Sequence, residues 1–331
     1  MRKIKKADIA FLKKVKDSIT HYGMIEKGDR VLVAVSGGAD SVCLLKSLLS
    51  FQKEMGIEVL VANLDHSLRG DASKRDSEFV RRLSEEEGVK FVFKKVNARS
   101  GRKGLSTEEK AREKRYAFLL KTAEKEGCRV IATGHTMDDQ AETVLMRMMY
   151  GSSLSGLTGI PPVREDGKVK IIRPLIRIER KDIESFLERN GYKHVKDASN
   201  KDLKFQRNRV RLKVLPYLEK QNPRIKRSLA NLSDSLREDL TLLNAKKEKV
   251  GSRSGRIKTA DIILQPKATR KDIFKELLKA AGGNIKKLTY RHWMDMDRFL
   301  KSAQKKKSLD LPGSVRVTKT SDEIVFTRRG K

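Results

Sequence analysis

The stretch that decides the fold is VLVAVSGGADSVCLLKSLL, residues 31–49. Its first part, Val31 to Val35, is a short, unbroken apolar run rich in β-branched residues, which is typical of a buried strand in a parallel sheet. From Asp40 onward the apolar residues recur at helical spacing. Gly37 and Gly38 therefore lie between a strand end and a helix start. Free backbone N–H groups and the positive end of the helix dipole gather there, which favours a bound anion.

This turn has an ordinary explanation, because such turns often need glycine for a positive φ and use Asp or Ser to cap the helix. It has neither the G-x-x-x-x-G-K-[ST] of a Walker loop nor the G-x-G-x-x-G of a dinucleotide site. Residues 36–41 instead combine two hydroxyls, two bare backbone positions and one carboxylate, a set that can wrap a pyrophosphate and hold Mg²⁺. The turn resembles the PP-loop of the ATP pyrophosphatase superfamily, whose members cleave ATP to AMP and pyrophosphate to adenylate a substrate.

Strand and helix patterns alternate beyond this turn. Strands are expected at residues 31–35, 57–64, 91–96 and 128–135, and helices at residues 71–87, 107–126 and 138–150. This alternation predicts an α/β fold with a doubly wound parallel sheet, whose ligands bind at the carboxyl ends of the strands. Three groups of polar residues follow such ends: Ser36–Ser41, Asp65-His66 and Gly134-His135. Residues 97–106 are polar and basic with two glycines and read as a loop.

The composition bounds the partners and the number of domains. The chain has 331 residues and a formal net charge of +32, which favours a polyanion such as nucleic acid. A solvated lysine-rich surface, as in a thermophile, is the alternative. We expect a catalytic domain over residues 1–217 and a smaller α+β domain over residues 218–331. In the second part, helices are expected at 225–248, 269–281 and 288–302, and strands at 314–318 and 323–327.

The cysteines and the N-terminus indicate the compartment. Cys43 and Cys128 lie far apart and read as small core residues in a reducing compartment, with no disulfide or zinc spacing. Lysines 13, 14 and 16 interrupt the apolar core that a signal peptide would need. No apolar run approaches the length that spans a membrane. We therefore expect a cytoplasmic protein without membrane contact.

A second informative stretch is GHTMDDQAETVLMRMM, residues 134–149. Asp138 and Asp139 begin a helix, where carboxylates complement the dipole and cap the first turn. Glu142 follows Asp138 by four residues, so both lie on one helix face. Capping explains one acid more easily than three. A carboxylate pair beside a nucleotide could hold a cationic substrate and accept a proton from an attacking amine.

Several motifs occur in the order of one known family. They are Ser36–Ser41, Asp65-His66 with Arg69, Glu108 to Tyr116, Gly134 to Thr143, and Asp197 to Arg211. In these the chain resembles the tRNA(Ile)-lysidine synthetases from end to end, most closely over about residues 30–215. The resemblance implies that ATP and free L-lysine convert the wobble cytidine of a CAU-anticodon isoleucine tRNA to lysidine, changing the codon read from AUG to AUA. Longer members carry a further C-terminal domain, for which this chain is too short.

The resemblance also implies roles for individual residues. Those expected to bind ATP are Ser36, Gly37, Gly38, Ala39, Asp40, Ser41, Asn63, His66 and Gly134, although His66 reads equally as a structural histidine. Asp40 and Asp139 are expected on Mg²⁺, and Asp138 and Glu142 on the lysine amine. Arg112 and His135 are expected beside the α-phosphate or the adenylated base. Arg207, Asn208 and Arg211 are expected to contact the tRNA, unless they form a solvated basic helix. The sequence leaves monomer and homodimer open.

Three rival functions remain at this level. A PP-loop tRNA thiolase would need a cysteine pair or cluster, which Cys43 and Cys128 do not form. A nucleotide sensor that binds RNA without turnover would keep the loop but need no paired acids at positions 138 and 142. A glutamine-dependent amidotransferase would need an N-terminal cysteine or a glutaminase domain. The paired acids therefore favour the ligase.

Overall fold

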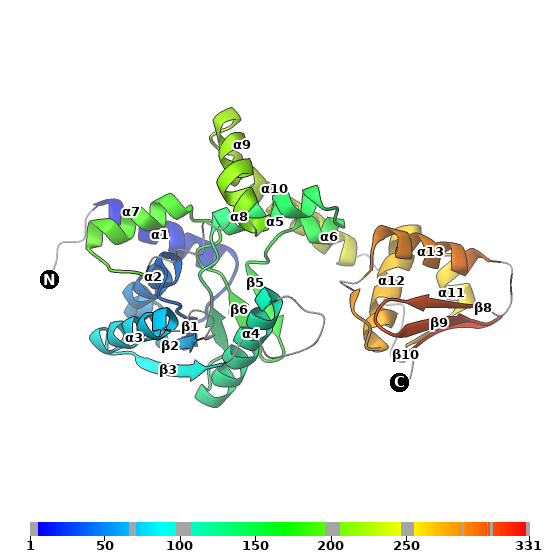
Figure 1. Cartoon of the computed structure of the whole chain (residues 1–331), viewed down its shortest axis with the longest axis horizontal. Coiled ribbons are helices and arrows are strands. Elements are labelled where there is room, and N and C mark those ends of the chain that lie inside the picture. Colours follow the sequence, from blue (N-terminus) through cyan, green and yellow to red (C-terminus); the bar gives the residue numbers. More distant parts are fainter. Residues whose placement is uncertain are drawn as a thin grey trace. The chain divides into compact units, whose positions relative to one another are not determined.

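The computed structural model describes residues 6–65, 71–96, 107–195, 206–245, 255–285, 288–302, 304 and 307–328. His66, the basic loop 97–106 and the motif at 197–202 lie outside the described residues. The chain divides into two compact units, Met1–Leu240 and Thr241–Lys331. Figure 1 shows the elements of each unit.

The first unit is built on a six-stranded sheet in the order β3-β2-β1-β4-β6-β5. Its strands are β1 (Arg30–Ala34), β2 (Glu58–Asp65), β3 (Lys90–Lys95), β4 (Val130–Ala132), β5 (Val163–Asp166) and β6 (Val169–Ile172). Strand β1 lies between β2 and β4 and pairs with both in parallel. The predicted doubly wound α/β fold is confirmed, with one addition: β5 pairs antiparallel with β6 at the edge.

Helices cover both faces of this sheet (Figure 1). The helices that begin in this unit are α1 (Lys6–His21), α2 (Ala39–Met55), α3 (Asp71–Glu86), α4 (Thr107–Glu126), α5 (Met137–Met149), α6 (Leu154–Leu157), α7 (Arg180–Asn190), α8 (Gln206–Arg209), the π-helix η2 (Val210–Val214), α9 (Leu215–Gln221) and α10 (Ile225–Ala245). Side chains of β1 alternate between the faces: Val31 and Val33 join the core under α1, α2 and α7, and Leu32 joins the core under α4. This continuous apolar strand is the pattern of a sheet buried on both sides.

The second unit packs helices on a four-stranded antiparallel sheet in the order β7-β10-β9-β8. Its elements are β7 (Arg256–Lys258), α11 (Thr259–Ile263), α12 (Lys267–Ala280), α13 (Tyr290–Lys301), β8 (Lys307–Leu311), β9 (Val315–Lys319) and β10 (Glu323–Arg328). Leu277, Leu300 and Val315 are fully buried in its core. Among the described residues, no helix is both long enough and apolar enough to cross a membrane.

The expected domain boundary at residue 217 differs from the division of the units after Leu240. The physical reason is helix α10, which begins beyond that boundary but packs on the first unit. Ile225 and Leu229 join the apolar cluster of α5 and η2. Arg237 donates to the carbonyl of Thr158 at 2.7 Å, and Tyr22 donates to Asp234 at 2.8 Å. Most of α10 therefore belongs with the sheet that carries the candidate site.

Candidate active site

The turn between β1 and α2 has the geometry of an anion cradle. Gly38 precedes α2 and leaves the start of this helix without a side-chain cap. Gly37 has a φ of +89°, and a Cβ there would lie 3.2 Å from Val195 Cγ2, so the turn requires glycine. Ser41 Oγ accepts a hydrogen bond from the Ser36 N–H at 3.2 Å and lies 3.3 Å from Ser36 Oγ. Hydroxyls and backbone thus surround an uncapped helix start, where phosphate binds favourably.

The carboxyl ends of two further strands meet this turn. Asn63, at the end of β2, is buried and donates to the Val35 carbonyl at 2.8 Å. Its Oδ1 has no hydrogen-bond partner in the part of the chain that the structure describes. Gly134 follows β4, and a Cβ there would lie 3.1 Å from the Asp40 carbonyl carbon. The loop after β4 therefore lies directly against the start of α2, and a side chain at position 134 would crowd the Asp40 backbone.

Asp40, in the first turn of α2, is the carboxylate of the cradle. Arg180 Nη2 donates to Asp40 Oδ2 at 2.6 Å. The other oxygen, Oδ1, is buried and has no hydrogen-bond partner among the described residues. Burial raises the pKa of Asp40 to about 6; Arg180 opposes this rise and the nearby Asp139 adds to it. One carboxylate oxygen of Asp40 is therefore bound by Arg180, and the other is available to a ligand.

Two carboxylates of α5 form one network with two arginines. Asp139 forms a capping box with Thr136, whose N–H donates to Asp139 Oδ2 at 2.8 Å. Arg207 donates to Asp139 Oδ1 at 2.8 Å and to Glu142 Oε2 at 2.7 Å. Arg211 donates to Glu142 Oε1 at 2.5 Å. Burial raises the pKa of Asp139, but the cations and the Thr136 N–H outweigh it and lower the pKa overall.

Asp138 belongs to a different network. Its Oδ2 accepts the backbone N–H of Arg180, the first residue of α7, at 2.8 Å. Its Oδ1 lies 2.8 Å from the ammonium of Lys226, in the first turn of α10. That ammonium also lies 2.9 Å from Glu219 Oε1. Asp138 therefore joins the starts of three helices and already binds an alkylammonium group.

The ring of His135 and the guanidinium of Arg112 were both expected near the reacting groups. His135 Nδ1 lies 3.0 Å from Thr133 Oγ1. Burial lowers the pKa of His135 to about 3, against the opposing effect of Asp139, so the ring is neutral near neutral pH. Arg112 lies on α4 with its guanidinium 5.0 Å from the centre of the Tyr116 ring. Its charge contributes to the lowered pKa of His135, as expected if the two share one pocket.

The expected grouping of the α5 acids differs from the structure. Asp138 and Glu142 were expected to act together, but Glu142 shares Arg207 with Asp139, whereas Asp138 pairs with Lys226. The reason is that Glu142 is fully buried beneath η2, while Asp138 faces α7 and α10.

The expected tRNA contacts also have partners within the chain. Arg207 and Arg211 are held by the α5 carboxylates, and Asn208 is buried. Their contact with RNA stays a prediction. Such a contact requires either guanidinium N–H groups that these ion pairs leave unused or the opening of the pairs.

Two residues of the site were not expected from the sequence. Arg180 lies in a segment not singled out above, Lys226 lies in one expected only to be helical, and their carboxylate partners lie far away along the chain. The sequence signal for both residues is a positive charge in the first turn of a helix. The positive end of the helix dipole makes this placement unfavourable, so such a cation needs a carboxylate partner. With Arg207 and Arg211 they supply four cations to the four carboxylates of the site.

The cysteines lie apart from this site. Cys43 and Cys128 are both free and buried, and burial raises the pKa of each thiol. Neither therefore offers the accessible thiolate that sulfur transfer needs.

The comparisons with known proteins agree with this geometry. The chain matches the PP-loop domain family over residues 8–218. It is 36% identical to a tRNA(Ile)-lysidine synthase of Geobacter sulfurreducens, over 97% of this chain and 69% of the relative. A tRNA(Ile)-lysidine synthase of Clostridioides difficile is 32% identical, over 95% of this chain and 70% of the relative.

Among solved structures, the U34-tRNA thiolase NcsA from Methanococcus maripaludis with its [4Fe-4S] cluster shares the fold, with a TM-score of 0.60 and 20% identity over 71% of this chain and 81% of that one. The anion cradle at the end of β1, the match over 8–218 and the relatives aligned over nearly all of the chain lead to one conclusion. The chain belongs to the tRNA(Ile)-lysidine synthase family of PP-loop, ATP-using tRNA-modifying enzymes.

Proposed function

We propose that this chain joins free L-lysine to carbon 2 of the wobble cytidine in a CAU-anticodon isoleucine tRNA, using ATP in the cytoplasm. The observation that carries the proposal is a juxtaposition at one edge of the sheet. An anion cradle, Ser36–Ser41, lies beside Asp138, a carboxylate that already binds an alkylammonium group. The first feature suits the phosphates of ATP, and the second suits the amine of lysine.

The first half-reaction activates the base. The cytosine oxygen attacks the α-phosphorus of ATP, forming a new P–O bond while the bond to the β-phosphate oxygen breaks. Pyrophosphate leaves with a developing negative charge, which the start of α2 and the hydroxyls of Ser36 and Ser41 stabilise. Arg112 would bind the α-phosphate, where charge also accumulates.

The residues present fit a magnesium ion in the cradle. Asp40 Oδ1 is a buried carboxylate oxygen with no hydrogen-bond partner among the described residues. Mg²⁺ is commonly held by one or two carboxylates together with substrate phosphates, so Asp40, with Asp139 as the second, would hold it. The ion would neutralise phosphate charge as pyrophosphate leaves.

The second half-reaction transfers lysine. The neutral amine attacks carbon 2 of the adenylated cytosine, the C–O bond breaks, and AMP leaves. Lysine is mostly protonated near neutral pH, so a carboxylate must hold the ammonium and accept its proton. Asp138 is the candidate, because the ammonium of Lys226 lies 2.8 Å from its Oδ1. Glu142, fully buried between Arg207 and Arg211, positions the neighbouring part of α5.

The test is a product analysis. Protein, ATP, Mg²⁺ and a CAU-anticodon isoleucine tRNA are incubated with and without L-lysine, and the wobble nucleoside is analysed by mass spectrometry. We expect lysidine only when lysine is present, and none on methionine tRNA, which has the same anticodon. The proposal would be contradicted if the cytidine stayed unmodified after incubation with ATP, Mg²⁺ and lysine, or if the same product formed without lysine.

A further inference from the structure

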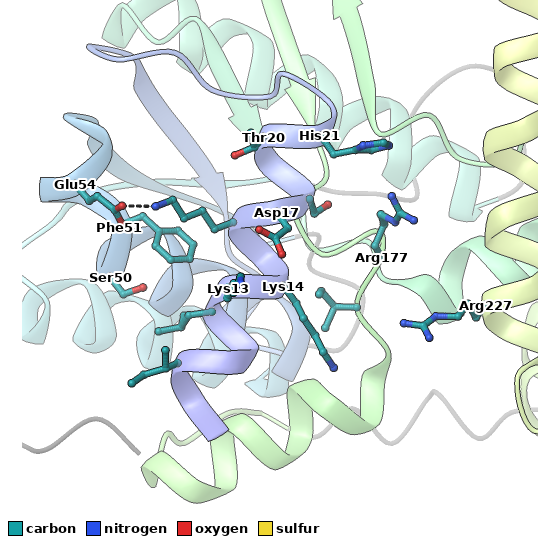
Figure 2. A pocket seen from close by; sticks show the side chains of 15 residues that line it. Lys13, Lys14, Asp17, Thr20, His21, Ser50, Phe51, Glu54, Arg177 and Arg227 are labelled. Atoms are coloured by element: carbon teal, nitrogen blue, oxygen red, sulfur yellow. Dashed lines mark hydrogen bonds and ion pairs between the residues drawn. The ribbon is translucent and has the colours of Figure 1, made fainter. Parts of the chain in front are cut away.

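A basic groove lies along α1, on the sheet face opposite α4 (Figure 2). It encloses about 960 Å³ between α1, the end of α2, the segment before α7 and the start of α10. Its polar and charged lining residues are Lys13, Lys14, Lys16, Asp17, Ser18, Thr20, His21, Ser50, Glu54, Arg177 and Arg227. We call this surface the α1 groove.

Cations without partners dominate the charge of the α1 groove. Lys14 pairs with Asp182 outside the groove, and Lys16 pairs with Glu54 inside it. Lys13, Arg177 and Arg227 are exposed and form no ion pair within the described part of the chain. Figure 2 shows Arg177 and Arg227 on separate elements beside α1. Asp17 also lines the groove without an ion pair among the described residues, so three unpaired cations face one carboxylate, and this excess of positive charge favours an anionic occupant.

Two short segments of the chain lead from the candidate active site to the groove. Lys226 contacts Asp138, and the next residue, Arg227, lines the groove. Arg177 lines the groove, and Arg180, three residues later, contacts Asp40. The cations of the groove therefore lie on the same helices, or directly before them, as two cations of the active site.

The remaining lining suits a sugar–phosphate backbone better than a folded protein partner. Thr20 offers a hydroxyl donor, the Ser50 hydroxyl donates to the Ser47 carbonyl but can still accept, the exposed His21 ring meets Tyr22 edge to face, and Ile9 is 56% exposed. Hydroxyls, flexible cations and small apolar contacts are typical of phosphate and ribose recognition, which positions a nucleic acid without reading its sequence.

From this we infer that the α1 groove binds the sugar–phosphate backbone of the tRNA arm whose wobble base enters the active site. The inference rests on the proposed function for the identity of that RNA. It adds an RNA contact surface on α1, a helix remote in sequence from the basic segment 207–211. Each cation would neutralise one phosphate, so binding through the groove depends steeply on salt.

The test compares two triple variants of the full chain. Lys13→Ala with Arg177→Ala and Arg227→Ala removes the unpaired cations of the groove. Lys121→Ala with Lys125→Ala and Arg129→Ala removes the same charge from exposed positions on α4 and the loop that follows it. The Kd for isoleucine tRNA is measured by fluorescence anisotropy at several salt concentrations, and unfolding curves check that both variants are folded.

We expect the groove variant to bind at least tenfold more weakly at low salt, with the slope of log K against log salt reduced by about 2 to 3. The α4 variant should keep the slope of the unaltered chain. In steady state, the groove variant should raise KM for tRNA and leave kcat unchanged. Equal slopes for all three proteins would overturn the inference, as would binding of an acidic protein with no effect on tRNA. Absence of lysidine from the unaltered chain would instead contradict the proposed function, because the slopes do not depend on product.

Discussion

At the scale of single residues, Asp40 is the group whose charge the site controls most closely. Burial raises its pKa to about 6, so its carboxyl holds a proton at pH values where an unfolded chain would have lost it. Any stability from this difference is present at low pH and is lost as pH rises from about 4 to about 6. Activity has the opposite requirement, because only the ionised form can hold a metal ion. Ligand binding at Asp40 should therefore weaken on the acid side of about pH 6.

Removing the cation on Asp40 tests this balance. Arg180→Gln takes away a charge that lowers the pKa of Asp40. In the pH profile of the rate of pyrophosphate release, the fall on the acid side (the acid limb) should therefore move to higher pH. More Mg²⁺ should move the limb back, since the metal competes with the proton. The control is Lys181→Gln, which removes an exposed neighbouring cation paired with Glu179. An acid limb that does not move in Arg180→Gln would show that Asp40 does not limit the reaction.

Lys226 is an internal competitor for the carboxylate that we assign to the substrate amine. Lys226→Met keeps the length of the side chain and frees Asp138 Oδ1. We expect KM for lysine to fall several-fold while KM for ATP stays unchanged, measured by initial rates of lysidine formation. Lys220→Met, on an exposed position of α9, is the control. If KM for lysine is unchanged or rises, Lys226 belongs to the fold or to the lysine site itself.

The sequence predicts the chemistry of the loop better than the ion pairs around it. Gly37 follows from a local rule, because the strand-to-helix turn needs a positive φ, whereas the crowding at Gly134 comes from the packing of its loop on the Asp40 backbone. The pairing of Asp40 with Arg180, and of Asp138 with Lys226, depends on how α7 and α10 pack against the sheet. Spacing along one helix carries no information on such partners.

At the scale of elements, the π-helix η2 links the basic segment to α5. Short π-helices occur frequently at functional sites, and this one follows α8 directly. Arg207 and Arg211 approach Glu142 from one side, while Val210 and Leu215 join the apolar cluster of Val144. The two helices are therefore held together by a buried carboxylate as well as by apolar packing.

Glu142→Gln tests that connection. The substitution keeps the shape but leaves two guanidinium groups without their full partner, so we expect the free energy of unfolding to fall by about 2 to 4 kcal/mol. Urea unfolding of the variant and of Glu184→Gln, an exposed glutamate on α7, gives the comparison. A loss below about 0.5 kcal/mol would show that apolar packing alone fixes η2 on α5.

Most regular elements of the first unit follow from periodicity, and the exceptions have physical causes. The helix expected at 107–126 matches α4, and the expected parallel strands match β1 to β4. The β5–β6 hairpin was not predicted, because its strands are four residues each and only Ile171 and Ile172 are fully buried. The boundary was expected at residue 217, whereas α10 packs on the first unit and the division falls after Leu240.

At the scale of the whole molecule, the net charge of +32 has two different uses. Some cations, such as Arg207 and Arg211, neutralise carboxylates inside the site. Others, such as Arg177 and Arg227, stay exposed in the α1 groove. Composition predicts a polyanionic partner but does not separate these two uses, because the separation depends on tertiary structure. The salt dependence of tRNA binding described above separates them experimentally.

The most direct test of the central claim follows the two half-reactions separately in Asp138→Asn. In a single turnover with labelled ATP, pyrophosphate and the wobble nucleoside are measured at successive times. We predict that the variant releases pyrophosphate at nearly the normal rate and accumulates adenylated tRNA, but forms lysidine at least tenfold more slowly, with partial rescue by more lysine or higher pH. If pyrophosphate release and lysidine formation fall together, or if lysidine forms at the normal rate, Asp138 does not bind the lysine amine and the account of the site is wrong.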